Sequence, residues 1–88
     1  HSILFIVEKP NIDIPENRQF WSSFQSALLD ISKTYAGVER LDENSAMIVL
    51  KNGLPAFCSL VNVAQSQKLS YRILFFDKEP EWFLYPQK

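Results

Sequence analysis

Apolar residues recur along this chain with two different periods, one helical and one typical of strands. Between Pro15 and Ala36 they return every three to four positions, as the exposed and buried sides of a surface helix require. This spacing predicts one long amphipathic helix over Pro15–Ala36. At about 100° per residue, one stripe collects Phe20, Phe24, Ala27, Ile31 and Tyr35, with Trp21 and Leu28 on its flank.

Signals for both ends of this helix are present. Asp13 is the predicted N-cap, and Glu16 three residues later completes a capping-box pattern. Pro15 falls in the first turn, where its missing N–H removes no hydrogen bond. Gly37 stands where a left-handed residue ends many helices. We therefore expect the helix to begin after Asp13 and to end before Gly37.

The other apolar residues form short runs that predict strands. The first run, Ile3–Val7, is almost continuously apolar, which is typical of an interior strand buried on both faces. A polar cluster, Asp42–Ser45, separates Val38–Leu41 from Ala46–Lys51 and predicts a hairpin whose first arm is a polar edge strand. Asn52-Gly53 and the turn around Pro80 predict two further hairpins. The apolar runs are Ile3–Val7, Met47–Leu50, Phe57–Val63, Tyr71–Phe76 and Trp82–Tyr85.

The segment Leu54–Gln67 supports two interpretations. As a strand, it places Phe57, Val61 and Val63 on one face, and the valines and the preceding Asn-Gly pair favour this. As a helix beginning at Pro55, it sets an uncharged polar arc opposite an apolar one. We favour the strand, although the helical pattern is also good.

These alternatives give two α+β architectures for a single domain spanning residues 1–88. With the strand, an antiparallel meander packs on one long helix, which is similar to a cystatin-like topology in element order; that family's inhibitory motifs are not found here. With the helix, the order becomes a ferredoxin-like βαββαβ with an added C-terminal strand, and Ile3–Val7 and Met47–Leu50 lie at the sheet centre. Both architectures leave one sheet face without a helix, and we expect a second protein chain to cover it.

Composition and charge narrow the function. The chain has 88 residues, 47% of them hydrophobic, and a net charge of -1, so it is long enough to bury a core of its own. That charge balance lacks the basic footprint of a nucleic-acid binder. No run is long enough to span a bilayer, and Ser2–Val7 is too short for a signal peptide. With Cys58 as the single cysteine, we expect a cytoplasmic protein, and His1 is given no role.

No catalytic, cofactor or metal pattern emerges from the residue types. A nucleophile needs a neighbouring base, and the only histidine is His1. Cys58 lies in an apolar run and is expected to be buried and inert. Metal ligands at zinc-site spacing are lacking. We therefore predict a protein that is not an enzyme and needs no cofactor.

Aromatic residues near the C-terminus are the candidate interaction site. Large aromatic side chains are favoured at the centre of protein interfaces, and most oligomers are symmetric dimers. The sequence therefore predicts a small interaction protein that binds itself or another protein, in the manner of accessory, immunity or antitoxin-type proteins. The alternative is a small-molecule pocket between helix and sheet. The interface candidates are Phe76, Trp82, Phe83 and Tyr85, and the pocket candidates are Tyr35, Tyr71 and Arg72.

Overall fold

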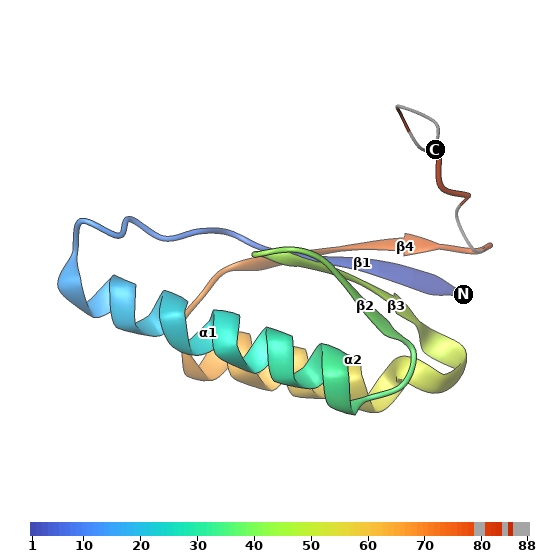
Figure 1. The fold of residues 1–88 in the computed structure, drawn as a ribbon, viewed down its shortest axis with the longest axis horizontal. Coiled ribbons are helices and arrows are strands. Elements are labelled where there is room, and N and C mark those ends of the chain that lie inside the picture. Colours follow the sequence, from blue (N-terminus) through green and yellow to red (C-terminus); the bar gives the residue numbers. More distant parts are fainter. Residues whose placement is uncertain (79–80, 84, 86–88) are drawn as a thin grey trace.

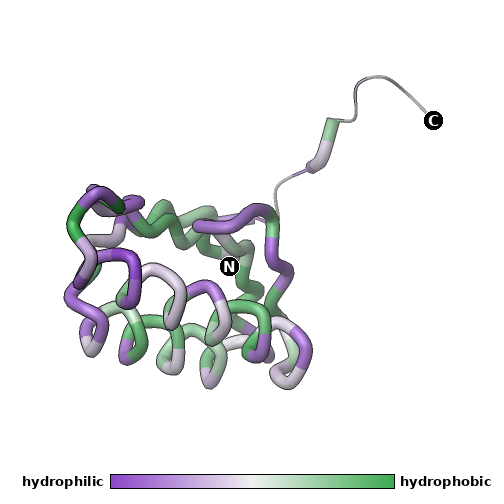
Figure 2. The backbone as a smooth tube through the Cα atoms, turned by 60° about the vertical axis from the view of Figure 1, so that its left-hand side comes forward, coloured by the Kyte–Doolittle hydropathy of each residue, from purple (hydrophilic) through white to green (hydrophobic). Residues whose placement is uncertain are grey.

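A computed structural model describes residues 1–78, 81–83 and 85, which form a sheet with both of its helices on one side (Figure 1). The sheet is antiparallel throughout, and the α+β class predicted from the sequence is confirmed. The central strands are mostly apolar, whereas the helices mix apolar and polar positions (Figure 2). In chain order the elements are β1 (Ser2–Val7), α1 (Pro15–Thr34), β2 (Val38–Asp42), β3 (Ser45–Val49), α2 (Leu50–Ser66) and β4 (Tyr71–Phe76).

The four strands lie in the order β2-β3-β1-β4, so β2 and β4 form the two edges. The two most apolar strands occupy the centre. Ile3 and Phe5 of β1 are fully buried, and they lie opposite Ile48 and Ala46 of β3, which are fully buried too. The prediction of an interior first strand is therefore confirmed.

Helix α1 packs through the side that carries Trp21, Phe24, Leu28 and Ile31, all of them buried. Phe24 and Ile31 of the predicted stripe are therefore buried, whereas Phe20 and Ala27 are only partly buried, so the buried side is rotated slightly toward the flanking Trp21 and Leu28. The helix ends at Thr34, so Tyr35 lies beyond it and is exposed. Trp21 stacks on Phe24 at 5.9 Å, and this large aromatic pair sets the side that faces the sheet.

The predicted cap at the start of α1 is wrong. Ile14, not Asp13, is the N-cap residue, and no side chain caps the helix. Asn11 takes over the local hydrogen bonding, since its Oδ1 accepts from the amide of Asp13 at 3.0 Å. Short Asn side chains readily bond the backbone two residues on, and this turn competes with the cap. At the other end, Gly37 has the predicted left-handed backbone, with φ of 76°.

The favoured interpretation of Leu54–Gln67 as a strand is wrong, because residues 54–66 belong to α2 and Gln67 is its C-cap. A meander on one helix therefore does not describe the protein. The helix buries one stripe of mostly small residues at helical spacing: Gly53, Ala56, Leu60 and Ala64. It begins earlier than the alternative interpretation proposed, at Leu50, and holds Pro55 inside.

Close packing explains why Asn52-Gly53 is not a hairpin turn. Gly53 lies in the first turns of α2, against the backbone of Gly37 and the side chain of Ile48. A Cβ at Gly53 would lie 2.7 Å from the carbonyl oxygen of Gly37 and 2.6 Å from Cγ2 of Ile48. The glycine therefore permits a close approach of helix to sheet, which is the other common reason for a glycine inside a helical pattern.

The predicted hairpin is confirmed in its position and its edge arm, but its turn is shorter than the predicted Asp42–Ser45, and its second arm ends at Val49 rather than at Lys51. β2 and β3 pair through the two-residue connection Glu43-Asn44, and β2 is an edge strand with four of its five residues exposed. Asn44 also fastens the hairpin to β1. Its carbonyl oxygen accepts from the amide of Val7 at 2.8 Å, and its side-chain amide donates to the carbonyl of Val7 at 3.1 Å.

The predicted last strand, Glu81–Tyr85, is wrong for the residues that the structure describes. Residues 81–83 and 85 are not in a strand and make no ladder with the sheet. Leu84, the turn at Pro80 and the predicted stop at Pro86 lie outside the described residues. The run Trp82–Tyr85 is apolar, but it is followed and preceded by prolines, which cannot donate to a ladder.

Candidate functional site

The side of the sheet that carries no helix is defined by the strand register. Leu4 on β1 lies opposite Met47 on β3 and opposite Leu74 on β4, so the three side chains share one face. Ile3 and Phe5, on either side of Leu4, point toward the helices. The apolar members of the opposite surface, here called the helix-free face, are Leu4, Ile6, Met47, Val49, Leu74 and Phe76.

The helix-free face is unusually apolar for a sheet surface without a helical cover. An antiparallel sheet that meets water on one side normally alternates apolar and polar residues. Here six apolar side chains from three adjacent strands lie together, and Leu74 is 55% exposed. The charged side chains on this face are few and lie at its margins. Glu39 lies beside Met47 and Arg72 beside Ile6, each on an edge strand.

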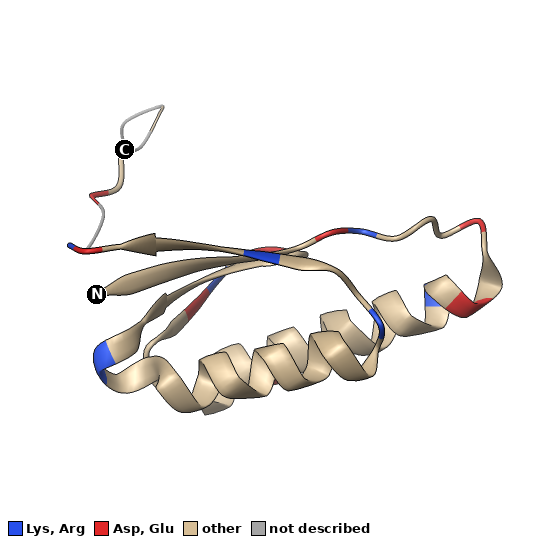
Figure 3. Ribbon diagram, turned by 180° about the vertical axis from the view of Figure 1, so that it is seen from behind, with Lys and Arg blue, Asp and Glu red and all other residues tan. Residues whose placement is uncertain are grey.

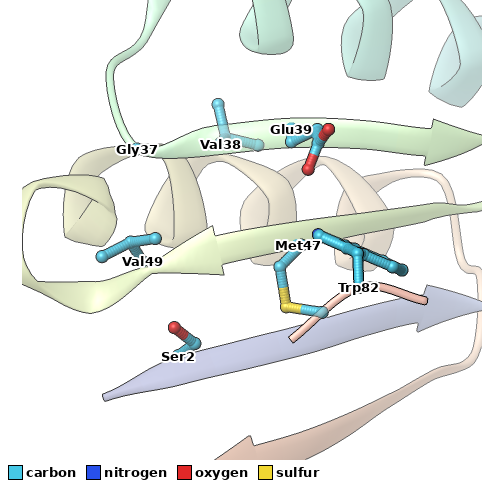
Figure 4. A pocket seen from close by; sticks show the side chains of 7 residues that line it. All are labelled: Ser2, Gly37, Val38, Glu39, Met47, Val49 and Trp82. Carbon is cyan, nitrogen blue, oxygen red and sulfur yellow. The ribbon is translucent and has the colours of Figure 1, made fainter. Parts of the chain in front are cut away.

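Part of this face is covered by the chain itself. Trp82 lines a hollow of about 250 Å³ together with residues of β1, β2 and β3, although it follows β4 in the chain. Figure 4 shows its ring beside the side chain of Met47. Trp82 is still 59% exposed, so it is a partial cover. The other residues around the hollow are Ser2, Gly37, Val38, Glu39 and Val49.

The four predicted interface residues occupy different environments. Phe76 is partly buried at the end of β4, on the helix-free face and opposite Ser2. Trp82 lies over the same face. Phe83 and Tyr85 are 81% and 89% exposed. The structure therefore brings Phe76 and Trp82 to one surface and leaves Phe83 and Tyr85 largely in solvent.

The three predicted pocket residues do not line one cavity. Tyr35 borders a shallow hollow at the end of α1, whereas Tyr71 and Arg72 line a hollow of about 430 Å³ at the end of β1. Tyr71 also belongs to the packing under the sheet, because its ring stacks on Phe5 at 5.2 Å. Its hydroxyl oxygen accepts from the side-chain amide of Gln65 at 3.3 Å.

Cys58 is exposed on α2, and the expectation that it is buried is wrong. The error follows from the strand interpretation, since on a helix Cys58 falls on the side away from the buried stripe of Ala56 and Leu60. Within the described part of the chain, no group of three or more His, Cys, Asp or Glu side chains gathers as a metal site.

Sequence reasoning named aromatic residues near the C-terminus and missed most of the helix-free face itself. The signal was present in the first strand. A continuous apolar run places large side chains on both faces, so Leu4 and Ile6 had to lie opposite the helix-packed Ile3 and Phe5. The missed members are Leu4, Ile6, Met47, Val49 and Leu74.

Comparison with models of protein families gives no match for this chain, and no curated protein matches at a significant level. Among the residues described, neither helix has the length and apolar character to cross a membrane.

Proposed function

We propose that this chain is a non-enzymatic interaction domain of the cytoplasm that forms a homodimer through its helix-free face. The observation that carries the proposal is the set of six apolar side chains on a sheet surface that no helix covers. Removing them from water favours association at about 25 cal/mol per Å² of apolar area. Its role is then exerted by binding, as in small accessory proteins of the immunity or antitoxin type.

A second copy is the simplest occupant of the face. Both partners present the same apolar centre with charges of opposite sign at its two margins, Glu39 on β2 and Arg72 on β4. A two-fold axis through the centre can bring Glu39 of one copy toward Arg72 of the other, so that charge complementarity fixes the orientation. Trp82 lies at the rim of the apolar centre and adds aromatic area to the contact.

The size of the face predicts a dimer that dissociates on dilution. Four strands spaced about 4.8 Å apart and about 18 Å long give a surface of about 350 Å² in projection. A standard interface buries about 800 Å² of accessible surface on each partner. We therefore expect the association to fall within a range of concentrations that light scattering can follow.

We also propose that the fold belongs to the ferredoxin-like class. The order βαββαβ, the antiparallel sheet β2-β3-β1-β4 and the helices on one side support this assignment. The class matters for function because its helices protect only one face of the sheet. The opposite face is then available to a partner.

The experiment compares two leucines of equal exposure on opposite sides of the molecule. Leu74 on the helix-free face is 55% exposed, and Leu54 on α2 is 54% exposed. Leu74→Glu places a charge in the proposed contact and should raise the dissociation constant at least about tenfold. Leu54→Glu should leave it unchanged. Light scattering across a dilution series measures both, and circular dichroism checks that both variants are folded.

Two outcomes would contradict the proposal. If the wild-type chain is monomeric at every concentration, the helix-free face does not bind a second copy, and the hollow beside Tyr71 and Arg72 becomes the surface to study. If Leu74→Glu and Leu54→Glu associate equally well, the chain associates through another surface.

A further inference from the structure

The two edges of the sheet are protected to very different degrees. Edge strands expose unpaired backbone groups, and proteins guard them with charges and irregular pairing. β2 has both devices, since it carries Glu39, Arg40 and Asp42, and its register with β3 shifts between Arg40 and Asp42. Figure 3 shows charged residues of both signs along this edge. β2 is therefore a poor template for a further strand.

β4, at the opposite edge, has neither the row of charged side chains nor the shift in register. Its register with β1 is continuous from Tyr71 to Phe76, and Arg72 is its single charged residue. It is also apolar and exposed on both sides. Leu74 on the helix-free face is 55% exposed, and Phe75 on the helix side is 67% exposed. The helical layer thus stops short of this part of β4.

The hydrogen-bond pattern tells which backbone groups of β4 point outward. The amide of Glu8 donates to the carbonyl of Ser70 at 2.8 Å. Because the direction of backbone groups alternates along an antiparallel strand, Arg72, Leu74 and Phe76 direct theirs toward β1. The outward groups of β4 therefore belong to the residues between them, Tyr71, Ile73 and Phe75.

We propose that β4 pairs in antiparallel fashion with β4 of a second copy, about a two-fold axis at Ile73. In this register Ile73 lies opposite Ile73 of the second copy, and Tyr71 lies opposite its Phe75. These are the outward-directed residues, so the Ile73–Ile73 and Tyr71–Phe75 pairs are the hydrogen-bonded ones. Two cross-strand Tyr–Phe pairs form, and they cover the Phe75 ring that the helices leave exposed. Arg72 meets Leu74, so no two like charges lie opposite each other.

Area is a second reason for a copy of this chain as the partner. Pairing at β4 joins two four-stranded sheets into one of eight strands, with all helices on the same side. The joined helix-free face measures about 700 Å² in projection, twice the value for one chain, which approaches the size of a standard interface. This inference rests on the proposed function for the second contact, through the face, and together the two contacts join more than two chains.

Amide hydrogen exchange tests the edge contact at single residues. At a concentration where about 90% of chains are paired, the amides of Tyr71, Ile73 and Phe75 should exchange about tenfold more slowly than in dilute protein. The amides of Arg72, Leu74 and Phe76 are the internal control, because they bond to β1 whether or not a partner is present. Fast exchange of the outward amides in an associated chain would overturn the proposal.

A pair of variants at Phe75 separates the backbone contact from the side chain. Phe75→Pro removes an outward N–H, which an edge strand tolerates because that group has no bond inside the chain. Phe75→Thr removes the same ring and keeps the N–H. Thermal melting checks that both fold. We expect Phe75→Pro to lose the edge contact and Phe75→Thr to keep it with lower affinity; equal association by both would contradict the strand pairing.

The solution mass distinguishes failure of this contact from failure of the proposed function. With both contacts, concentrated wild type is larger than a dimer, and Phe75→Pro and Leu74→Glu are each dimers. With the face contact alone, wild type and Phe75→Pro are dimers, Leu74→Glu is a monomer, and the edge proposal falls. With the edge contact alone, wild type and Leu74→Glu are dimers with slow outward amides, and the face proposal falls. A monomer under all conditions overturns both.

Discussion

The two faces of the sheet carry similar apolar side chains but differ in how far these side chains are buried. On the covered face, Ile3 and Phe5 are fully buried against the helices. On the opposite face, Leu4 and Ile6 of the same strand are only partly buried, and Leu74 of the neighbouring strand is more than half exposed. The residue types of the strands therefore do not determine which side chains are buried. The faces differ because helices pack against one of them and not against the other.

The difference teaches where to look for function in a chain with no catalytic pattern. A covered apolar face is explained by folding, because burial of its side chains stabilises the domain. An apolar face without a cover is not explained by folding of one chain, and contiguous apolar surfaces of this kind mark interaction sites. Among the edges, β4 likewise stands out from β2, because it is apolar and lacks the charges and the register shift of β2.

The largest expected effect comes from neighbouring residues of β1 that point to opposite faces. Phe5→Ala should lower the free energy of unfolding by about 3–5 kcal/mol, because Phe5 is fully buried and packs on Phe57 and Tyr71. Ile6→Ala should cost about 1 kcal/mol or less in the monomer, since its side chain lies on the helix-free face. Urea unfolding of dilute protein measures both. Equal losses would mean that the two faces are equally buried within one chain.

The next effect tests how tightly the covered face is packed. Gly53→Ala should lower the free energy of unfolding by about 1–3 kcal/mol, because the added Cβ would meet the carbonyl oxygen of Gly37 at 2.7 Å. Asn62→Ala, at an exposed position of the same helix, should be neutral or slightly stabilising. Urea unfolding of the two variants gives the comparison. A tolerated Gly53→Ala would show that α2 does not lie so close to the sheet.

The smallest effect concerns the partial cover on the helix-free face. Trp82→Ala should change the free energy of unfolding of the monomer by less than about 1 kcal/mol, since Trp82 is 59% exposed. Phe83→Asp, at an 81% exposed position, should be neutral within about 0.5 kcal/mol. Both variants should remain folded in thermal melting. A loss as large as that of Phe5→Ala would place the C-terminal aromatic residues in the core of the chain.

The elements that sequence reasoning predicted well are those with one dominant local signal. The spacing of Trp21, Phe24, Leu28 and Ile31 indicates a helix, and the continuous apolar run of β1 indicates a central strand. α2 was ambiguous because its valines and uncharged polar residues fit a strand nearly as well. Its Gly53 looked like part of a turn, and only the tertiary approach to Gly37 reveals its role.

The sequence is sufficient to predict that one sheet face has no helical cover. It is not sufficient to predict which residues form that face. Counting apolar runs against available helix indicates that one face lacks a helical cover. Which residues lie there depends on register, and the misassigned α2 altered the number and order of the strands. Trp82 shows a further limit, because no local pattern in the sequence indicates that it lies beside Met47 of β3.

The most direct test of the central claim is the solvent accessibility of individual methyl groups as a function of protein concentration. A soluble paramagnetic agent broadens the NMR signals of exposed methyls, and Leu4, Ile6, Met47 and Leu74 report on the helix-free face. Leu54 on α2, 54% exposed, is the control. We predict that the four face residues become protected as concentration rises while Leu54 stays accessible. Equal accessibility of the face residues at all concentrations would contradict a second copy on this face.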